Sequence, residues 1–235
     1  MKHPTDTGPS PARSGPPLRI YVVRHAETAW SLAGRHTGRT DLPLTAHGQD
    51  MARTLATALA GVAFSRVLTS PSGRSRATCE LAGLGATAIT DAGLAEWDYG
   101  KCEGMRTCEI RQRMPAWDIW LDGCPSGETP ARVATRADLL ITRLQDGDGP
   151  VAVFTHGHFG RALAARWIGL PVAQGRHFAM GPASVGILGC DTHHPTRRVI
   201  ALWNSFAGAV VAPHVRQHTD ETAPVADHRR NTHSE

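Results

Sequence analysis

Apolar and polar positions vary along this chain in a way that predicts buried strands separated by helices. Short apolar runs rich in β-branched residues recur between residues 18 and 204, and such runs suit strands that are covered on both faces. Each run is bounded by polar residues, glycine or proline. The predicted strands are residues 18–23, 64–70, 86–89, 151–155, 184–190 and 198–204.

Helical spacing of apolar residues fills most of the intervals between these strands. One apolar stripe runs through residues 46–59, and a second, longer one runs through residues 128–144. Further helices are expected over about 72–83 and over 161–170. The alternation predicts the α/β class, as a three-layer sandwich with a mostly parallel central sheet and helices on both faces.

The two ends of the chain differ in composition from the middle. Residues 1–17 are rich in proline, serine and glycine, so we expect a flexible leader. Residues 213–235 are polar, which predicts a disordered tail, and one domain is expected over residues 18–212. The histidines of the tail are irregularly spaced and are not expected to bind a metal; they are His214, His218, His228 and His233.

Composition narrows the classes of function. Hydrophobic residues make up 41% and charged residues 20%, as in ordinary globular domains. No apolar run approaches the ~20 residues that cross a bilayer, and the first residues lack a secretory signal, so we expect a cytoplasmic protein without a membrane partner. The five cysteines are scattered without a CxxC pair, which predicts reduced thiols and no zinc site.

The net charge of +4 is modest, and only two of the 25 basic residues are lysines. No run of arginines resembles a polybasic arm, so nucleic acid is not an expected partner. An anion-binding pocket accounts for clustered arginines better. Whether the chain forms a homodimer is left open by the sequence.

Cationic and imidazole side chains follow three of the predicted strands. The first strand runs into Arg24 and His25, and Arg74 follows the second at a short distance. The fourth strand ends at His156 and Gly157, where the glycine allows close backbone approach to a ligand. Each feature alone fits a surface arginine or a structural histidine. Because ligands of such sheets bind beyond the carboxyl ends of the strands, the three together indicate an anion held beside a nucleophile.

The ordered set of motifs resembles the histidine phosphatase superfamily, also called the phosphoglycerate mutase-like family. The RHAET of residues 24–28 is similar to its RHGET hallmark, and Ser70 to Thr78 match SP-x-x-R-x-x-x-T. The resemblance covers residues 18–206 and is closest to a small-molecule phosphatase branch that includes sedoheptulose-bisphosphatase-like and actinobacterial acid phosphatases. Further matches are Trp30, Thr37, Gly38, Leu44, Thr45, Gly48, Leu94, Glu96, His156 and Gly157.

This resemblance implies a phosphomonoesterase of the histidine acid phosphatase type that acts on a small phosphorylated metabolite, such as a sugar phosphate. His25 would attack phosphorus and become a phosphohistidine, with Glu96 as general acid and base. Neither a metal nor another cofactor is implied, because the cationic pocket takes the place of Mg²⁺. The phosphoryl oxygens would be held by Arg24, Arg74 and His156, and further substrate contacts are implied for Ser31, Thr37, Gly38, Tyr99 and Gly157.

Two further functions stay open at this point. A mutase would use the same phosphohistidine, although the longer basic insertion of the phosphoglycerate mutases is missing here. A non-catalytic module that binds a phosphorylated ligand is suggested only by Ala26, which replaces the usual glycine beside His25.

Three tryptophans could line the pocket mouth or pack in the core, namely Trp97, Trp117 and Trp120. Four histidines are expected to be bystanders, namely His36, His47, His158 and His177.

Overall fold

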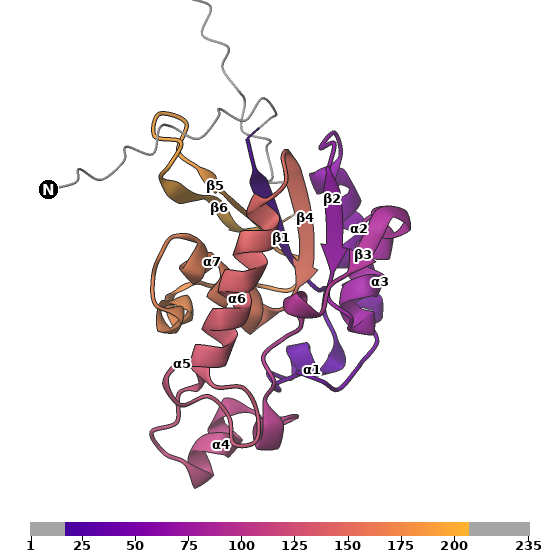
Figure 1. Cartoon of the computed structure of the whole chain (residues 1–235). Coiled ribbons are helices and arrows are strands. Elements are labelled where there is room, and N and C mark those ends of the chain that lie inside the picture. Colours follow the sequence, from indigo (N-terminus) through magenta and orange to yellow (C-terminus); the bar gives the residue numbers. More distant parts are fainter. Residues whose placement is uncertain (1–16, 207–235) are drawn as a thin grey trace, which may run out of the picture.

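The computed structural model describes residues 17–206, which form a six-stranded sheet between two layers of helices (Figure 1). The strand order is β3-β2-β4-β1-β5-β6, and the first four strands of that order run parallel. Strand β5 pairs antiparallel with both β1 and β6. The predicted class and the mostly parallel sheet are confirmed. The strands are β1 Arg19–Arg24, β2 Arg66–Thr69, β3 Ala88–Thr90, β4 Pro150–Thr155, β5 Val185–Cys190 and β6 Arg198–Ser205.

Successive residues of the central strands feed two separate cores, because side chains alternate between the faces of a sheet. On one face, Ile20 and Val22 of β1 join the core formed with α6 (Pro130–Gln145) and α7 (Gly157–Trp167). On the other, Tyr21 and Val23 join the core formed with α2 (Ala46–Leu59) and α3 (Gly73–Leu81). All four of these strand side chains are at most 4% exposed, which explains why the strand is a continuous apolar run.

Short elements without a clear apolar period cover the carboxyl edge of the sheet. These are α1 (Ala29–Leu32), α4 (Thr107–Arg113) and α5 (Ile119–Asp122), none of which the apolar pattern predicts. Figure 1 shows them below the ends of β2 and β4. Four 3₁₀ turns were also not predicted: η1 Gly85–Thr87, η2 Ala92–Leu94, η3 Gly100–Cys102 and η4 Val172–His177.

The longer elements agree with the apolar pattern, although several of their boundaries are displaced. Helix α2 covers the predicted residues, and α6 begins at Pro130, capped by the hydroxyl of Thr129. Helix α7 begins at Gly157, four residues earlier than predicted. The three tryptophans that could have lined the pocket mouth pack in the core instead. Trp97, Trp117 and Trp120 are at most 4% exposed.

The expectations on cysteines, membrane spans, metal sites and domain boundaries can be compared with the structure only over residues 17–206. All five cysteines lie within residues 17–206 and are free thiols. In this described part of the chain, no helix is long and apolar enough to span a membrane. The same residues contain no group of three or more His, Cys, Asp or Glu side chains suited to a metal ion. The predicted leader, apart from Pro17, and the predicted tail lie outside the described residues, so the domain boundaries stay predictions.

Two adjacent leucines of α6 provide a test of this packing. Leu140 is fully buried, whereas Leu139 is 63% exposed. We expect Leu140→Ala to lower the free energy of unfolding by about 2–5 kcal/mol, because it removes buried methyl groups and leaves a cavity. Leu139→Ala should change it by less than about 0.5 kcal/mol. Urea unfolding followed by circular dichroism measures both, and equal losses would contradict the assignment of the buried face.

Candidate active site

His25 lies at the point where β1 leaves the sheet. Its backbone amide donates to the carbonyl of Thr155 at 2.9 Å, which extends the β1–β4 ladder by one residue. The ring Nδ1 lies 2.8 Å from the carbonyl oxygen of Ala26. Because a carbonyl can only accept, Nδ1 carries the proton and Nε2 keeps its lone pair. Burial, then Arg24 and Arg74, holds the pKa of His25 well below 6.5, so the ring is neutral at neutral pH.

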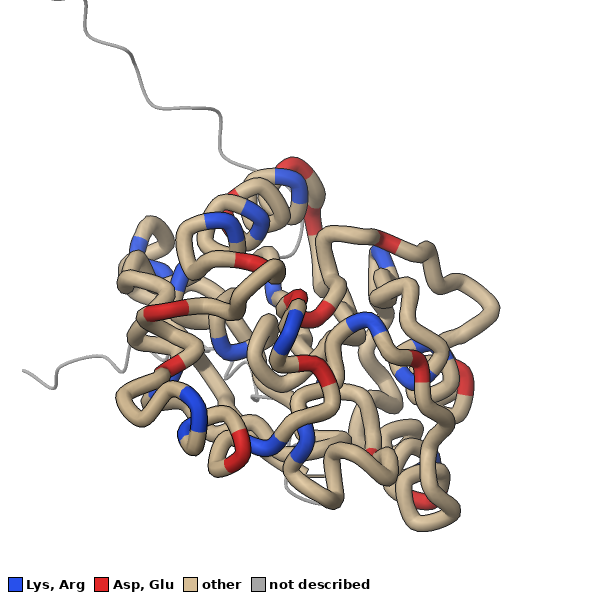
Figure 2. Tube along the Cα trace, turned by 90° about the horizontal axis from the view of Figure 1, so that it is seen from below, with Lys and Arg blue, Asp and Glu red and all other residues tan. Residues whose placement is uncertain are grey.

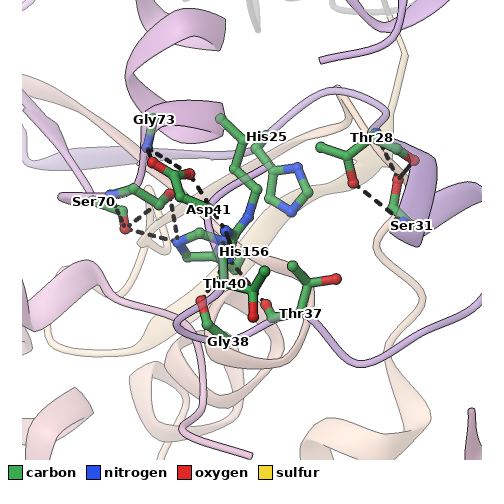
Figure 3. A network of polar contacts seen from close by, with 12 residues as sticks. His25, Thr28, Ser31, Thr37, Gly38, Thr40, Asp41, Ser70, Gly73 and His156 are labelled. Atoms are coloured by element: carbon green, nitrogen blue, oxygen red, sulfur yellow. Dashed lines mark hydrogen bonds and ion pairs between the residues drawn. The ribbon is translucent and has the colours of Figure 1, made fainter. Parts of the chain in front are cut away.

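The second imidazole, His156, is oriented by Arg74 and Ser70. Arg74 Nη2 donates to His156 Nδ1 at 3.2 Å, so the ring proton lies on Nε2, which donates to Ser70 Oγ at 2.7 Å. Figure 3 shows these contacts beside the His25 ring, whose centroid is 5.2 Å from that of His156. Burial, followed by Arg74, lowers the pKa of His156 well below its ordinary value. Both rings are therefore neutral side chains with fixed tautomers.

Arg24 and Arg74 each bring a buried, unsatisfied donor to this region. Within the described residues, the Nε atoms of Arg24 and Arg74 are the buried side-chain nitrogens or oxygens that have no hydrogen-bond partner. Arg74 is 1% exposed, and burial is the largest influence that lowers the pKa of each guanidinium. Leaving such donors unpaired is costly. A bound anion that accepts from both Nε–H groups would remove this cost.

Gly157 gives Arg24 the room to lie against the first turn of α7. A Cβ atom at Gly157 would come 3.3 Å from both Cζ and Nε of Arg24. Arg24 Nη1 also donates to the carbonyl of Met180 at 2.5 Å, which fixes the other side of the guanidinium. Gly157 therefore allows another group to lie close to its backbone, as predicted. In this structure that group is the Arg24 guanidinium and not a ligand.

Glu96 occupies the N-terminus of α7, where unpaired amides favour an anion. Its Oε1 accepts from the amides of Trp97 at 2.9 Å and Phe159 at 2.8 Å. Among residues 17–206, its Oε2 accepts only from the amide of His158, at 3.1 Å, so this oxygen has a lone pair left. The carboxylate lines both a cavity of about 270 Å³ that contains His25 and a cavity of about 620 Å³ that contains His156.

The other predicted residues divide between these two cavities, except Arg74, which lines neither of them. Ser31, Thr37, Tyr99 and Gly157 line the smaller one, together with Arg24, whereas Gly38 lines the larger. The Ser31 hydroxyl donates to the carbonyl of Thr28 at 3.0 Å and accepts from the Thr28 amide at 2.9 Å, which completes the capping box of α1. The Thr37 hydroxyl donates to the carbonyl of Arg35 at 3.1 Å.

Tyr99 and Gly38 are also engaged with protein groups. Tyr99 is 1% exposed, and its hydroxyl lies 2.7 Å from Nδ1 of His158. Burial raises the pKa of the Tyr99 phenol well above 10, so it stays neutral. The Gly38 amide donates to the carboxylate of Glu103 at 2.9 Å. This amide therefore has a protein partner in this structure, and its contact with a substrate stays a prediction.

Comparison with known proteins identifies the family of this chain. Residues 20–205 match the model of the histidine phosphatase superfamily (branch 1). The chain belongs to this superfamily. It is 42% identical over 190 residues to an acid phosphatase of Mycobacterium tuberculosis, which covers 78% of this chain and 91% of the relative. It is 36% identical over 188 residues to the sedoheptulose 1,7-bisphosphatase of Saccharomyces cerevisiae, which covers 66% of this chain and 69% of the relative.

A solved structure also resembles this histidine phosphatase closely. The product of an open reading frame of Mycobacterium tuberculosis superimposes with a TM-score of 0.76 and 39% sequence identity, over 81% of this chain and 98% of that chain. The family and the phosphatase relatives show that this chain is an enzyme of the histidine phosphatase type.

Ala26, the residue after His25, fits this histidine phosphatase without strain. Within the described residues, the non-glycine residues with positive φ are Ser126, Ala183 and Asn204, so Ala26 has a backbone open to L-residues. Ala26 is fully buried, and its amide donates to Thr78 Oγ1 at 3.0 Å. The methyl group therefore packs in the core and does not disturb the histidine.

Two histidines expected to be bystanders line the cavity of His25, so that expectation is wrong for His36 and His158. Both rings pack against the ring of Tyr99, and the centroids of the two imidazoles are 5.7 Å apart. Burial lowers the pKa of His36 to about 4, and burial followed by Arg161 lowers that of His158 well below 6.5. Arg161 of α7 also lines this cavity. Its position one helical turn after Gly157 is the signal that could have found it.

The remaining two histidines agree with the expectation. The His47 side chain is 71% exposed and lies 3.4 Å from Glu27, and His177 is exposed beside Arg176. Neither residue lines the cavity of His25 or the larger cavity. Figure 2 shows the molecule from below, with basic and acidic positions interspersed along the chain.

The buried neutral imidazoles predict how stability depends on pH. The unfolded chain takes up a proton on His36 as the pH falls through 6.5, whereas the folded chain does so only near 4, so stability is lost across this window as the pH falls. In His36→Gln the decline between pH 6.5 and 4 should be shallower, by up to roughly 1.4 kcal/mol per pH unit. Urea unfolding at several pH values measures this. The exposed control His177→Gln should keep the wild-type slope, and an unchanged slope in His36→Gln would refute the prediction.

Proposed function

We propose that this enzyme hydrolyses small phosphomonoesters through a phosphohistidine on Nε2 of His25. The observation that carries the proposal is a neutral imidazole with a free Nε2, buried beside two arginines whose Nε–H groups lack partners. A phosphoryl group is a tetrahedral anion that can accept from several such donors at once. Arginine also keeps its charge and presents its donors in a rigid plane.

In the first step, the Nε2 lone pair attacks phosphorus and the bond from phosphorus to the ester oxygen breaks. The positive charge that develops on the ring is stabilised by the Nδ1–H bond to the carbonyl of Ala26. Arg24 and Arg74 hold the non-bridging oxygens through the transition state, which is where preorganised donors contribute most. His156, fixed by Ser70 and Arg74, completes this clamp.

Glu96 is the proposed general acid. Protonated on Oε2, the oxygen with one amide partner, it transfers this proton to the departing oxygen. In the second step, the resulting carboxylate takes a proton from water, whose oxygen attacks phosphorus. The phosphorus–nitrogen bond then breaks, and inorganic phosphate leaves with His25 neutral again. Neither a metal nor another cofactor takes part, because the arginines supply the positive charge.

The proposed substrate is a small phosphorylated metabolite, such as a sugar phosphate. One relative is named as an acid phosphatase and another as a sedoheptulose 1,7-bisphosphatase, which supports this class. The cavity of about 270 Å³ beside His25 and the one of about 620 Å³ beside His156 offer room for such a molecule. Both cavities are lined by polar and charged residues, which suit hydroxyl groups on the leaving group.

Covalent capture tests the nucleophile. After brief incubation with a ³²P-labelled phosphoester and a rapid quench, the protein should carry phosphate that is stable to base and labile to acid. His25→Ala should lose both this label and turnover, because it removes the nitrogen that attacks phosphorus. Both ring nitrogens of the neighbouring His156 already have hydrogen-bond partners. EDTA should change neither in the wild type. Turnover at the wild-type rate in His25→Ala would exclude the mechanism.

A comparison of leaving groups tests Glu96. Glu96→Gln should lower kcat for an alkyl phosphate by about 10²–10⁴-fold, the usual contribution of a general acid. The same variant should lose far less with p-nitrophenyl phosphate, because nitrophenolate departs without a proton. Steady-state phosphate release measures both rates. Equal losses on the two substrates would remove Glu96 from the role of acid.

A further inference from the structure

The loop from Thr37 to Thr40 lies between a carboxylate and a guanidinium that do not touch each other. On one side, the amides of Gly38 and Thr40 donate to Oε1 of Glu103, at 2.9 and 3.1 Å. On the other side, Arg74 donates to the carbonyl oxygens of Thr37 and Gly38, both at 3.0 Å, and of Thr40 at 2.9 Å. The loop thus presents its amides to the negative group and its carbonyls to the positive one.

One peptide group takes part in both sets of contacts. The carbonyl of Thr37 and the amide of Gly38 belong to the same planar unit, so this unit accepts from Arg74 and donates to Glu103. Hydrogen bonds in such a chain polarise one another, and each end here is charged. Glu103 therefore stabilises Arg74 through the backbone, although no contact joins their side chains.

The backbone around Glu103 fixes the carboxylate against this loop. The amide of Gly104 donates to the carbonyl of His36 at 2.8 Å, and the amide of His36 donates to the carbonyl of Met105 at 2.9 Å. The fit is close, because a Cβ atom at Gly38 would come 2.8 Å from Oε2 of Glu103. Both carboxylate oxygens of Glu103 accept from the amide of Gly38, and Glu103 lines neither the cavity of His25 nor that of His156.

We propose that Glu103 is a positioning residue that fixes the guanidinium of Arg74 for anion binding by way of the loop from Thr37 to Thr40. This inference rests on the proposed role of Arg74 in the phosphate clamp. Without the negative charge, the two loop amides have only a neutral acceptor, and the carbonyls that hold Arg74 are fixed less firmly. The affinity of the site for a tetrahedral anion should then fall, although Glu103 never contacts that anion.

Binding of orthovanadate, measured by isothermal titration calorimetry, tests the inference without any need for turnover. Glu103→Gln keeps the size of the side chain and removes its charge. It should raise the Kd of vanadate roughly tenfold, in the range of couplings within one hydrogen-bond network. If Glu103→Gln does not fold, Glu103→Asp, which keeps the carboxylate on a shorter stem, serves the same test with a smaller loss expected.

A matched control is available in the connection between β5 and β6. Asp191 Oδ1 also accepts from two loop amides, those of His193 at 2.8 Å and His194 at 3.0 Å, and it lines neither cavity. Asp191→Asn should leave the Kd of vanadate unchanged. A general effect of removing a loop carboxylate would therefore appear in both variants, whereas the proposed effect appears only in the variants of Glu103.

A double-mutant cycle with Arg74→Lys distinguishes positioning of Arg74 from a general structural role. Lysine keeps the charge but lacks the planar set of donors. If Glu103 acts through Arg74, Glu103→Gln should weaken vanadate binding by less than about twofold in the Arg74→Lys background. The inference is overturned if the two losses multiply, or if Glu103→Gln alone binds vanadate as tightly as the wild type. If instead the wild type neither binds vanadate nor releases phosphate, the proposed function itself fails.

Discussion

The parallel pairing of β4 with β1 and β2 is the constraint on which the site depends. Arg24 is level with Thr155, and Thr69 is level with Phe154, so neighbouring strands end at nearly the same height. The chain then continues each ladder by one hydrogen bond before it turns away, from His25 to Thr155 and from Ser70 to Phe154. A shift of register would separate the two imidazole rings and move every second side chain to the opposite core.

Given this register, the site is an arrangement of buried cations that the fold leaves partly unsatisfied. Arg74 uses both Nη atoms on backbone carbonyls and His156, yet its Nε and that of Arg24 have no partner within the described residues. A protein that buries charge in this way sacrifices stability unless a ligand completes the set. Burial and these same cations keep the pKa of His25 low, so a site suited to anions also holds an uncharged imidazole.

The sequence predicted those parts of the fold in which the spacing of apolar residues indicates which side chains are buried. Strand β1 and helix α2 were found because continuous apolar residues and a single apolar stripe each imply one structure. Helix α7 was placed too late, because its first turn, Gly157 to Gly160, contains two glycines and a histidine and so lacks a helical signal. Helix α4 has only Ile110 buried, which leaves no stripe to detect.

The same reasoning explains which site residues the sequence could and could not reveal. His25, Arg74 and His156 follow predicted strands, so parallel topology was enough to bring them together. His36 follows no strand, and it reaches the cavity only because residues 36 and 104–105 pair as backbone across a segment without a period. His158 lies two residues after His156, but nothing in the spacing shows that its ring faces Tyr99. Such contacts are set by tertiary packing alone.

Glu96 and Glu103 are both glutamates, but their surroundings suit them to different functions. Both carboxylates accept from backbone amides, and both lie in the segment that covers the carboxyl edge of the sheet. Glu103 holds a loop and lines neither cavity, whereas Glu96 lines both. A carboxylate can exchange a proton with a ligand only where one of its oxygens is open to that ligand. The position of the segment between η2 and η3, rather than the identity of its acidic residues, therefore determines which glutamate is suited to acid catalysis.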